Sequence, residues 1–168
     1  INLADTFAFT GTVTGAGGVN TPAFMASVTS DQTINHNTAT KIAFANEVFD
    51  TDTTYDASTN YRWTPGVVGY YAIGAGGWFY QSGGDLGSME LYIYKNGSDI
   101  VFPMYENKNN VLRRFWMHTS LVIYVGSTSD YYEVFATHNT SGSATAKWSG
   151  SGNNAKFRNY FYGYKLIT

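Results

Sequence analysis

The stretch from Tyr61 to Phe79 constrains the fold of this chain more than any other segment. It begins with polar residues, turns at Pro65-Gly66 and continues as a run of small and apolar residues. Proline fixes its own φ and disfavours helix in the residue before it, so the corner separates two extended segments. After the corner, the alternate positions that begin at Tyr70 and at Tyr71 are all apolar or small. We therefore expect this strand to be covered on both faces, by a sandwich core and by a second copy of the chain.

The composition predicts an all-β domain. Aromatic residues make up 17% of the 168 residues and charged residues only 13%, and the chain contains 18 glycines. Strands and tight turns use such residues, whereas long amphipathic helices need more Leu, Glu and Lys. Eight to ten short alternating segments predict two packed antiparallel sheets, as in an immunoglobulin-like sandwich or a jelly roll.

Charge and cysteine content exclude several classes of function. The net charge is −2 with the signs interspersed, which gives no electrostatic reason for binding nucleic acid or an anionic membrane. No apolar run approaches 18 residues, so we expect no membrane insertion. The chain has no cysteine, which excludes disulfides and thiolate metal sites.

Residues 1–20 are expected to form a strand from Thr6 to Val13 and a glycine-rich joint from Thr14 to Gly18. The joint has two interpretations, a hinge to the next strand or a junction between an upstream shaft and a globular head. Residues 21–168 are expected to form the jelly-roll domain.

Within that domain, Lys95-Asn-Gly-Ser98 predicts a two-residue hairpin. We expect continuous strands over Lys41 to Phe49 and, buried on both sides, over Leu121 to Val125. The last strand, Asn159 to Ile167, carries three tyrosines on one side, a face that we interpret as core or subunit interface. The residues predicted to lie in the core or the trimer interface are Phe24, Tyr71, Tyr160, Tyr162 and Tyr164.

Ligand binding is predicted near the middle of the chain, where Arg113, Arg114, Trp116 and His118 follow a polar turn. Exposed aromatic faces contact sugars and protein partners, although core packing of Trp116 is an equal alternative. For Trp78, at the end of the central strand, we expect core packing.

Metal binding and catalysis have weak support in the sequence. Asp50, Asp52 and Asp56 alternate in one loop, and clustered oxygen ligands bind calcium, but capping of turns by aspartate is the other interpretation. No nucleophile elbow or His-Glu-x-x-His motif occurs, so we predict no enzymatic activity and no required cofactor.

From Thr21 to Ile167 the chain resembles a C1q-like domain through several short motifs in the family's order. In the first half these are Phe24 with Ala26, Lys41 to Asn46, Tyr55-Asp56, and Pro65 with Gly69-Tyr70-Tyr71. In the second half they are Leu91 through Gly97, Val125-Gly126, Tyr131 to Phe135, and Phe161 to Leu166.

The resemblance implies a ten-stranded jelly roll of the C1q and tumour necrosis factor type, assembled as a homotrimer. Members are recognition modules, often heads on fibrous stalks, and some bind calcium near the axis. The surface rich in Tyr, Thr and Asn, and the absence of cysteine, resemble C1q-like domains in bacteriophage structural proteins.

The expected function is therefore a trimeric phage virion protein, a fibre head or capsid-surface component that attaches to host surface glycans or to another virion protein. A purely structural trimerisation domain and a secreted C1q-like lectin are the alternatives.

Overall fold

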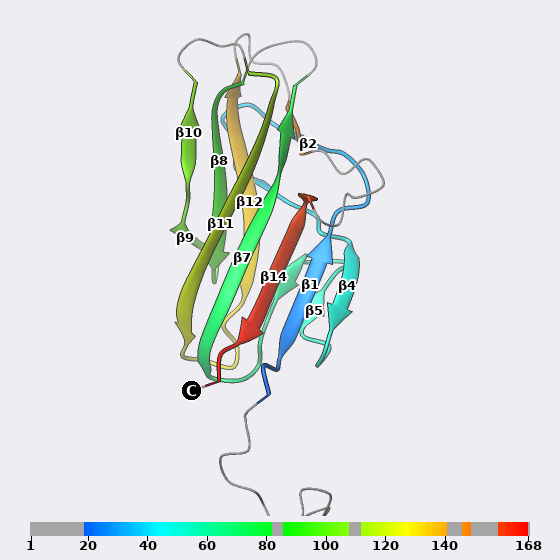
Figure 1. Ribbon diagram of the computed structural model, residues 1–168, viewed down its shortest axis with the longest axis vertical. Coiled ribbons are helices and arrows are strands. Elements are labelled where there is room, and N and C mark those ends of the chain that lie inside the picture. Colours follow the sequence, from blue (N-terminus) through cyan, green and yellow to red (C-terminus); the bar gives the residue numbers. More distant parts are fainter. Residues whose placement is uncertain (1–18, 82–85, 108–111, 141–145, 149–157, 168) are drawn as a thin grey trace, which may run out of the picture.

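The computed structural model describes residues 19–81, 86–107, 112–140, 146–148 and 158–167, which form two packed antiparallel sheets (Figure 1). Sheet A has the strand order β4 (Asn46–Asp50), β1 (Ala23–Ser27), β14 (Tyr160–Lys165), β7 (Gly69–Tyr80), β11 (Arg114–Val125). Beyond the start of β14, β13 (Ala146–Trp148) pairs with the last residues of β7, and β2 (Gln32–Ile34) pairs with β13.

Sheet B is built on β8 (Leu86–Lys95) and β12 (Tyr132–Thr140). On the far side of β8 lie β9 (Ser98–Val101) and β10 (Met104–Glu106). On the far side of β12 lie β3 (Thr40–Lys41) and β6 (Arg62–Trp63), and β5 (Tyr55–Asp56) pairs with β6. Among the described residues, no helix is long and apolar enough to cross a membrane.

β7 is the central strand of sheet A, as the Tyr61 to Phe79 stretch predicted. Gly66 adopts φ 72° at the corner, a left-handed value that glycine tolerates without strain. Tyr71 is fully buried, and its hydroxyl donates a 2.8 Å hydrogen bond to the Val67 carbonyl, which ties the corner to the strand. β14 pairs along one edge of β7 and β11 along the other, so β7 has no open edge next to them.

The core contains two buried tryptophans, each packed against other aromatic rings. Trp63 lies 4.7 Å from Phe24 and 5.4 Å from Tyr71 between ring centroids. Trp148 lies 5.2 Å from Phe79. Large aromatic side chains contribute most of the apolar area that drives folding, so these two clusters provide much of the stability.

Both tryptophans depend on a facing glycine. A Cβ atom at Gly163 would lie 2.8 Å from Trp63 Cε3 and Cη2, and still closer to Cζ3. A Cβ atom at Gly77 would lie 2.5 Å from Trp148 Cη2 and nearer to two other ring atoms. Real Cβ atoms do not approach rings so closely, so β14 and β7 need glycine where the indoles cross them.

Several predictions from the pattern are confirmed. The Asn96-Gly97 hairpin has φ values of 52° and 83°, as a type I′ turn requires, and it joins β8 to β9. The final strand keeps Tyr160, Tyr162 and Tyr164 on one side, as predicted; Phe161 points into the core and the tyrosine side points away from it. The predicted strand from Thr6 to Val13 and the glycine-rich joint lie outside the described residues.

Two predicted strands were wrong in detail. The segment from Lys41 to Phe49 is divided into β3 and β4, because the Gln32 side chain bonds the Lys41 carbonyl and the Ala43 amide where a strand partner would be. The segment from Leu121 to Val125 is covered on one side only, since it belongs to the 12-residue strand β11 at the edge of sheet A.

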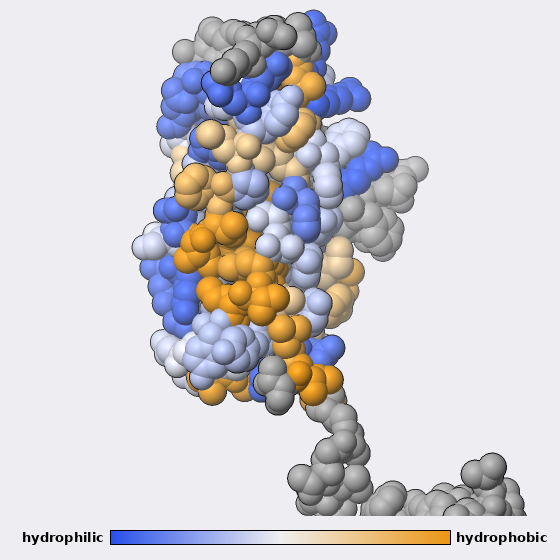
Figure 2. Space-filling model, turned by 60° about the vertical axis from the view of Figure 1, so that its left-hand side comes forward, coloured by the Kyte–Doolittle hydropathy of each residue, from blue (hydrophilic) through white to orange (hydrophobic). Residues whose placement is uncertain are grey.

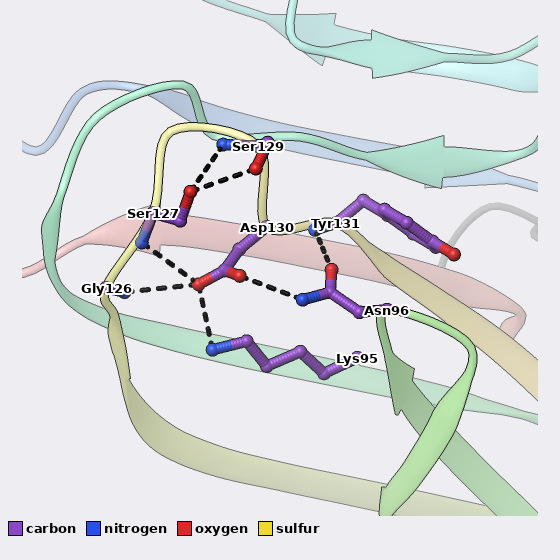
Figure 3. Close-up of polar contacts among 7 residues, drawn as sticks. All are labelled: Lys95, Asn96, Gly126, Ser127, Ser129, Asp130 and Tyr131. Atoms are coloured by element: carbon purple, nitrogen blue, oxygen red, sulfur yellow. Dashed lines mark hydrogen bonds and ion pairs between the residues drawn. The ribbon is translucent and has the colours of Figure 1, made fainter.

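Asp130 fixes the turn between β11 and β12 and joins it to the β8–β9 hairpin (Figure 3). Its carboxylate accepts hydrogen bonds from Lys95 Nζ at 2.8 Å and Asn96 Nδ2 at 2.9 Å. It also accepts the backbone amides of Gly126 and Ser127 at 3.1 and 3.2 Å. The Lys95 hydrogen bond is the main cause that lowers the pKa of Asp130 to about 2; hydrogen bonds from Asn96 and Ser127 lower it further, while burial acts in the opposite direction.

This network predicts a pH-dependent contribution to stability. Because the pKa of Asp130 is about 2 in the folded state and ~4 when unfolded, its contribution is complete above pH ~4 and is lost as the pH falls toward 2. Asp130→Asn should cost about 2 kcal/mol of unfolding free energy at pH 7, because charge-assisted hydrogen bonds weaken. The difference from the wild type, measured by urea unfolding at pH 7, 4, 3 and 2, should shrink below pH 4. Asp99→Asn, an exposed neighbour of the same hairpin, is the control, and a difference that persists unchanged at pH 2 would contradict this role.

A candidate assembly and ligand-binding face

The outer face of sheet A carries aromatic and apolar side chains where solvent-exposed strands usually carry polar ones. Strand alternation places one set of residues inward and the other outward on each of β7, β11 and β14. Val122 is 64% exposed and Tyr124 is 54% exposed, although the first side chain is apolar and the second consists mostly of an aromatic ring. The outward residues are Tyr70, Ala72, Gly74, Gly76 and Trp78 on β7, Arg114, Trp116, His118, Ser120, Val122 and Tyr124 on β11, and Tyr160, Tyr162 and Tyr164 on β14.

Three tyrosines of β14 form a row along this face. Tyr160 and Tyr162 lie 6.0 Å apart between ring centroids, and Tyr162 and Tyr164 lie 6.3 Å apart. The rings of Tyr160 and Tyr162 cover the glycines opposite them on β7. A Cβ atom at Gly74 would lie 2.6 Å from Tyr162 Cζ, and one at Gly76 would lie 3.0 Å from Tyr160 Cζ. The glycines therefore let the rings lie close against the sheet.

The part of the face between the start of β7 and Trp116 is uncharged. Burial, followed by the neighbouring tyrosine hydroxyl, raises the pKa of Tyr160 and of Tyr162, so both stay neutral at ordinary pH. The outward residues of β11 that follow Trp116, and those of β7 that precede Trp78, include no Asp, Glu, Lys or Arg. A neutral surface with aromatic bodies and hydroxyl tips has the composition of protein interfaces.

The other end of the face, where β7 finishes and β11 begins, carries arginine side chains, and we call it the arginine–aromatic end. The Arg114 guanidinium lies 5.0 Å from the centroid of the Tyr80 ring, and the Arg158 guanidinium lies 5.2 Å from that of Trp78. Trp116 is 44% exposed and donates a 2.9 Å hydrogen bond from Nε1 to the Arg158 carbonyl. The arginine–aromatic end consists of Trp78, Tyr80, Arg114, Trp116 and Arg158.

The structure brings three of the four predicted ligand residues together. Arg114, Trp116 and His118 share the outer face, and the Trp116 and His118 rings stack 5.9 Å apart. Arg113 precedes β11, and strand alternation directs it away from Arg114. Of the residues predicted to be in the core or the interface, Phe24 and Tyr71 are fully buried in the core. Tyr160, Tyr162 and Tyr164 lie on the outer face.

Sequence reasoning missed Trp78, Tyr80 and Arg158 as members of this face. The core interpretation of Trp78 was wrong, because Trp78 shares the parity of Tyr70 along β7 and so points outward, partly exposed. That parity was readable from the sequence. The place of Arg158 was not, since it depends on how β14 pairs with β7.

The aspartate loop is built of capped turns. Asp50 accepts the Tyr55 amide at 2.7 Å, and Asp56 accepts the Thr59 amide at 2.9 Å. The Asp52 carboxylate accepts a 2.5 Å hydrogen bond from the Thr51 hydroxyl. Among the described residues no group of three or more His, Cys, Asp and Glu side chains is arranged to hold a metal ion.

A second apolar surface lies beside β11, where the two sheets separate. We call it the open edge; it consists of Ile100, which is exposed, and of Val101, Leu121 and Ile123, which are partly buried against the core. Figure 2 brings this side of the molecule forward and shows a hydrophobic patch over its middle. The open edge and the outer face of sheet A are different surfaces of one protomer, and within the described residues each is at least partly exposed.

No protein-family model matches the chain, and no curated protein matches it by sequence. Solved structures do match. Murine APRIL at pH 8.0 is 10% identical with a TM-score of 0.60, over 86% of this chain and 98% of that one. The globular domain of zebrafish complement 1qA is 13% identical with a TM-score of 0.56, over 87% of this chain and 98% of that one. Eiger TNF from S. frugiperda is 6% identical with a TM-score of 0.56, over 86% of this chain and 90% of that one. The fold is thus an antiparallel jelly roll of the C1q/TNF type.

Proposed function

We propose that this chain is a non-enzymatic homotrimeric head domain of a bacteriophage fibre or virion surface, which attaches to host surface glycans or to another virion protein. The observation that carries the trimer is the neutral aromatic outer face of sheet A. A monomer would leave this face in water, and large exposed apolar patches mark interaction sites.

The two apolar surfaces also favour a ring over a two-fold dimer. In a two-fold dimer the same patch contacts itself, whereas a ring joins two different patches of neighbouring copies. The open edge of one protomer and the outer face of sheet A on the next provide such a pair. The C1q/TNF fold supports three copies as the number that closes the ring.

The positions of the two ends of the folded part favour a head domain that is carried on a shaft. Ala23 at the start of β1 pairs with Tyr164 near the end of β14, so both termini of the folded part emerge at one end (Figure 1). The arginine–aromatic end lies at the opposite end of β7, where that strand finishes at Tyr80. An attachment site at that end would face away from the shaft.

The mass of the purified chain tests the assembly. Light scattering coupled to size-exclusion chromatography should give three times the 18.5 kDa mass of one chain, without change over a hundredfold dilution. Obligate interfaces bury roughly 2,000 Å² or more and stay associated at such dilution. A stable monomer would overturn the proposal.

A further inference from the structure

Within the part of the chain that the structure describes, the two arginines at the arginine–aromatic end form no ion pair with an acidic side chain. Each guanidinium lies over an aromatic ring, Arg114 over Tyr80 and Arg158 over Trp78. The ion pairs within the described residues are Lys41–Glu133 and Lys95–Asp130, and neither involves these arginines. A guanidinium whose face rests on a ring still presents its N–H edge, which matches a carboxylate or sulfate with two hydrogen bonds.

The two cations lie over the same strand, β7. Arg114 pairs with Tyr80 on one edge of β7, and Arg158 precedes the strand β14 that pairs on the other edge. The rings beneath them belong to alternate residues of β7, which lie ~7 Å apart along a strand, so a ligand with acidic groups at about that interval meets both arginines.

Trp116 provides an apolar surface beside the arginines. Its Nε1 donates to the Arg158 carbonyl, which orients the indole, and the side chain is still 44% exposed. A flat indole contacts the C–H face of a sugar ring, as large rigid aromatics do at binding surfaces. Acidic groups together with a ring that has an apolar face describe an acidic saccharide.

Nucleic acid fits these observations less well. Backbone recognition needs a stripe of Lys and Arg along several phosphates, and the chain has a net charge of −2 with 10 Lys and Arg in total. Burial of the arginines against another protomer would require a carboxylate opposite each of them.

We infer that the arginine–aromatic end is a binding site for acidic saccharides that carry carboxylate or sulfate groups. Arg114 and Arg158 bind the acidic groups, and Trp116 stacks on a sugar ring beside them. The inference deepens the proposed attachment role by naming its ligand class, but it does not require the trimer, because one protomer carries all three residues.

The test measures binding of the full chain to oligogalacturonate by isothermal titration calorimetry, with neutral dextran oligosaccharide, sodium sulfate and a DNA oligonucleotide as comparison probes. We expect binding to oligogalacturonate that weakens with added salt and no binding to dextran. The double variant Arg114→Gln/Arg158→Gln should weaken binding at least tenfold, and Trp116→Ala should weaken it too. Arg62→Gln is the matched control, because Arg62 lies 4.7 Å from the Tyr131 ring on the other sheet and should leave binding unchanged.

The outcomes separate the alternatives. Equal binding of DNA, or of sulfate alone at the same charge concentration, would overturn the saccharide assignment. Loss of the trimer in the double variant would show that the arginines pair with a neighbouring copy, which also overturns it. Light scattering on the same samples keeps the two proposals apart: a monomer that binds the saccharide refutes only the assembly, and a trimer that does not bind it refutes only the site.

Discussion

Gly163→Ala should lower the melting temperature by about 10 °C, because the new methyl group has no space beside Trp63. The added Cβ would lie 2.8 Å from two atoms of a ring that is fully buried and packed against other aromatic rings. Overpacking of this kind costs about 3 kcal/mol, which for a chain of this length corresponds to roughly 6–12 °C. Thermal unfolding followed by circular dichroism measures the change.

A control and a compensating variant make this expectation specific. At Gly126 the nearest atom to a new Cβ is 3.7 Å away, in the Tyr124 ring, so Gly126→Ala should change the melting temperature little. Trp63→Phe replaces the indole, which the new methyl group would contact, with a smaller ring. The double variant Gly163→Ala/Trp63→Phe should therefore lose less stability than the sum of the two single variants, with a coupling of about 1 kcal/mol or more. Additive losses would mean that the contact with Trp63 is not the cause.

Val122→Glu should convert the proposed trimer to monomers. Val122 is 64% exposed in the protomer and contributes little to its core, so folding should persist. In the assembly the substitution would place three carboxylates in an apolar contact without cationic partners, and each costs several kcal/mol to desolvate. Light scattering should show a threefold fall in mass, while far-ultraviolet circular dichroism stays as in the wild type.

Met104→Glu is the matched control for that experiment. Met104 is 61% exposed, similar to Val122, but it pairs with Glu90 on the outer face of sheet B. The same charge at this position should leave the mass unchanged. If Val122→Glu kept the trimeric mass, or if both variants lost it, the outer face of sheet A would not be the contact.

Much of the fold was predictable because it depends on local patterns. The hairpin at Asn96-Gly97 needs positive φ at both turn positions, and these two residue types tolerate it better than others. The alternation in β14 was sufficient to show that its tyrosines share one face, but not which face. That choice depends on Gly163, whose missing side chain makes room for Trp63 from another part of the chain.

The remainder depends on contacts between distant segments. Trp148 lies in a stretch rich in Ser, Gly and Thr, yet it is fully buried against Phe79. Arg158 joins Trp78 and Trp116 only through the pairing of β14 with β7. The alternation of side chains along one strand does not show which strand will pair with it. The arginine–aromatic end could therefore be predicted only in part.

The pairing of Ala23 with Tyr164 has a practical consequence for protein engineering. Since the first and last strands run side by side in opposite directions, the folded unit enters and leaves at the same pole. Three copies could then be encoded in one gene with short flexible linkers, and each could be altered independently. Such a single polypeptide would allow one, two or three intact arginine–aromatic ends to be compared at constant stoichiometry, which would measure avidity directly.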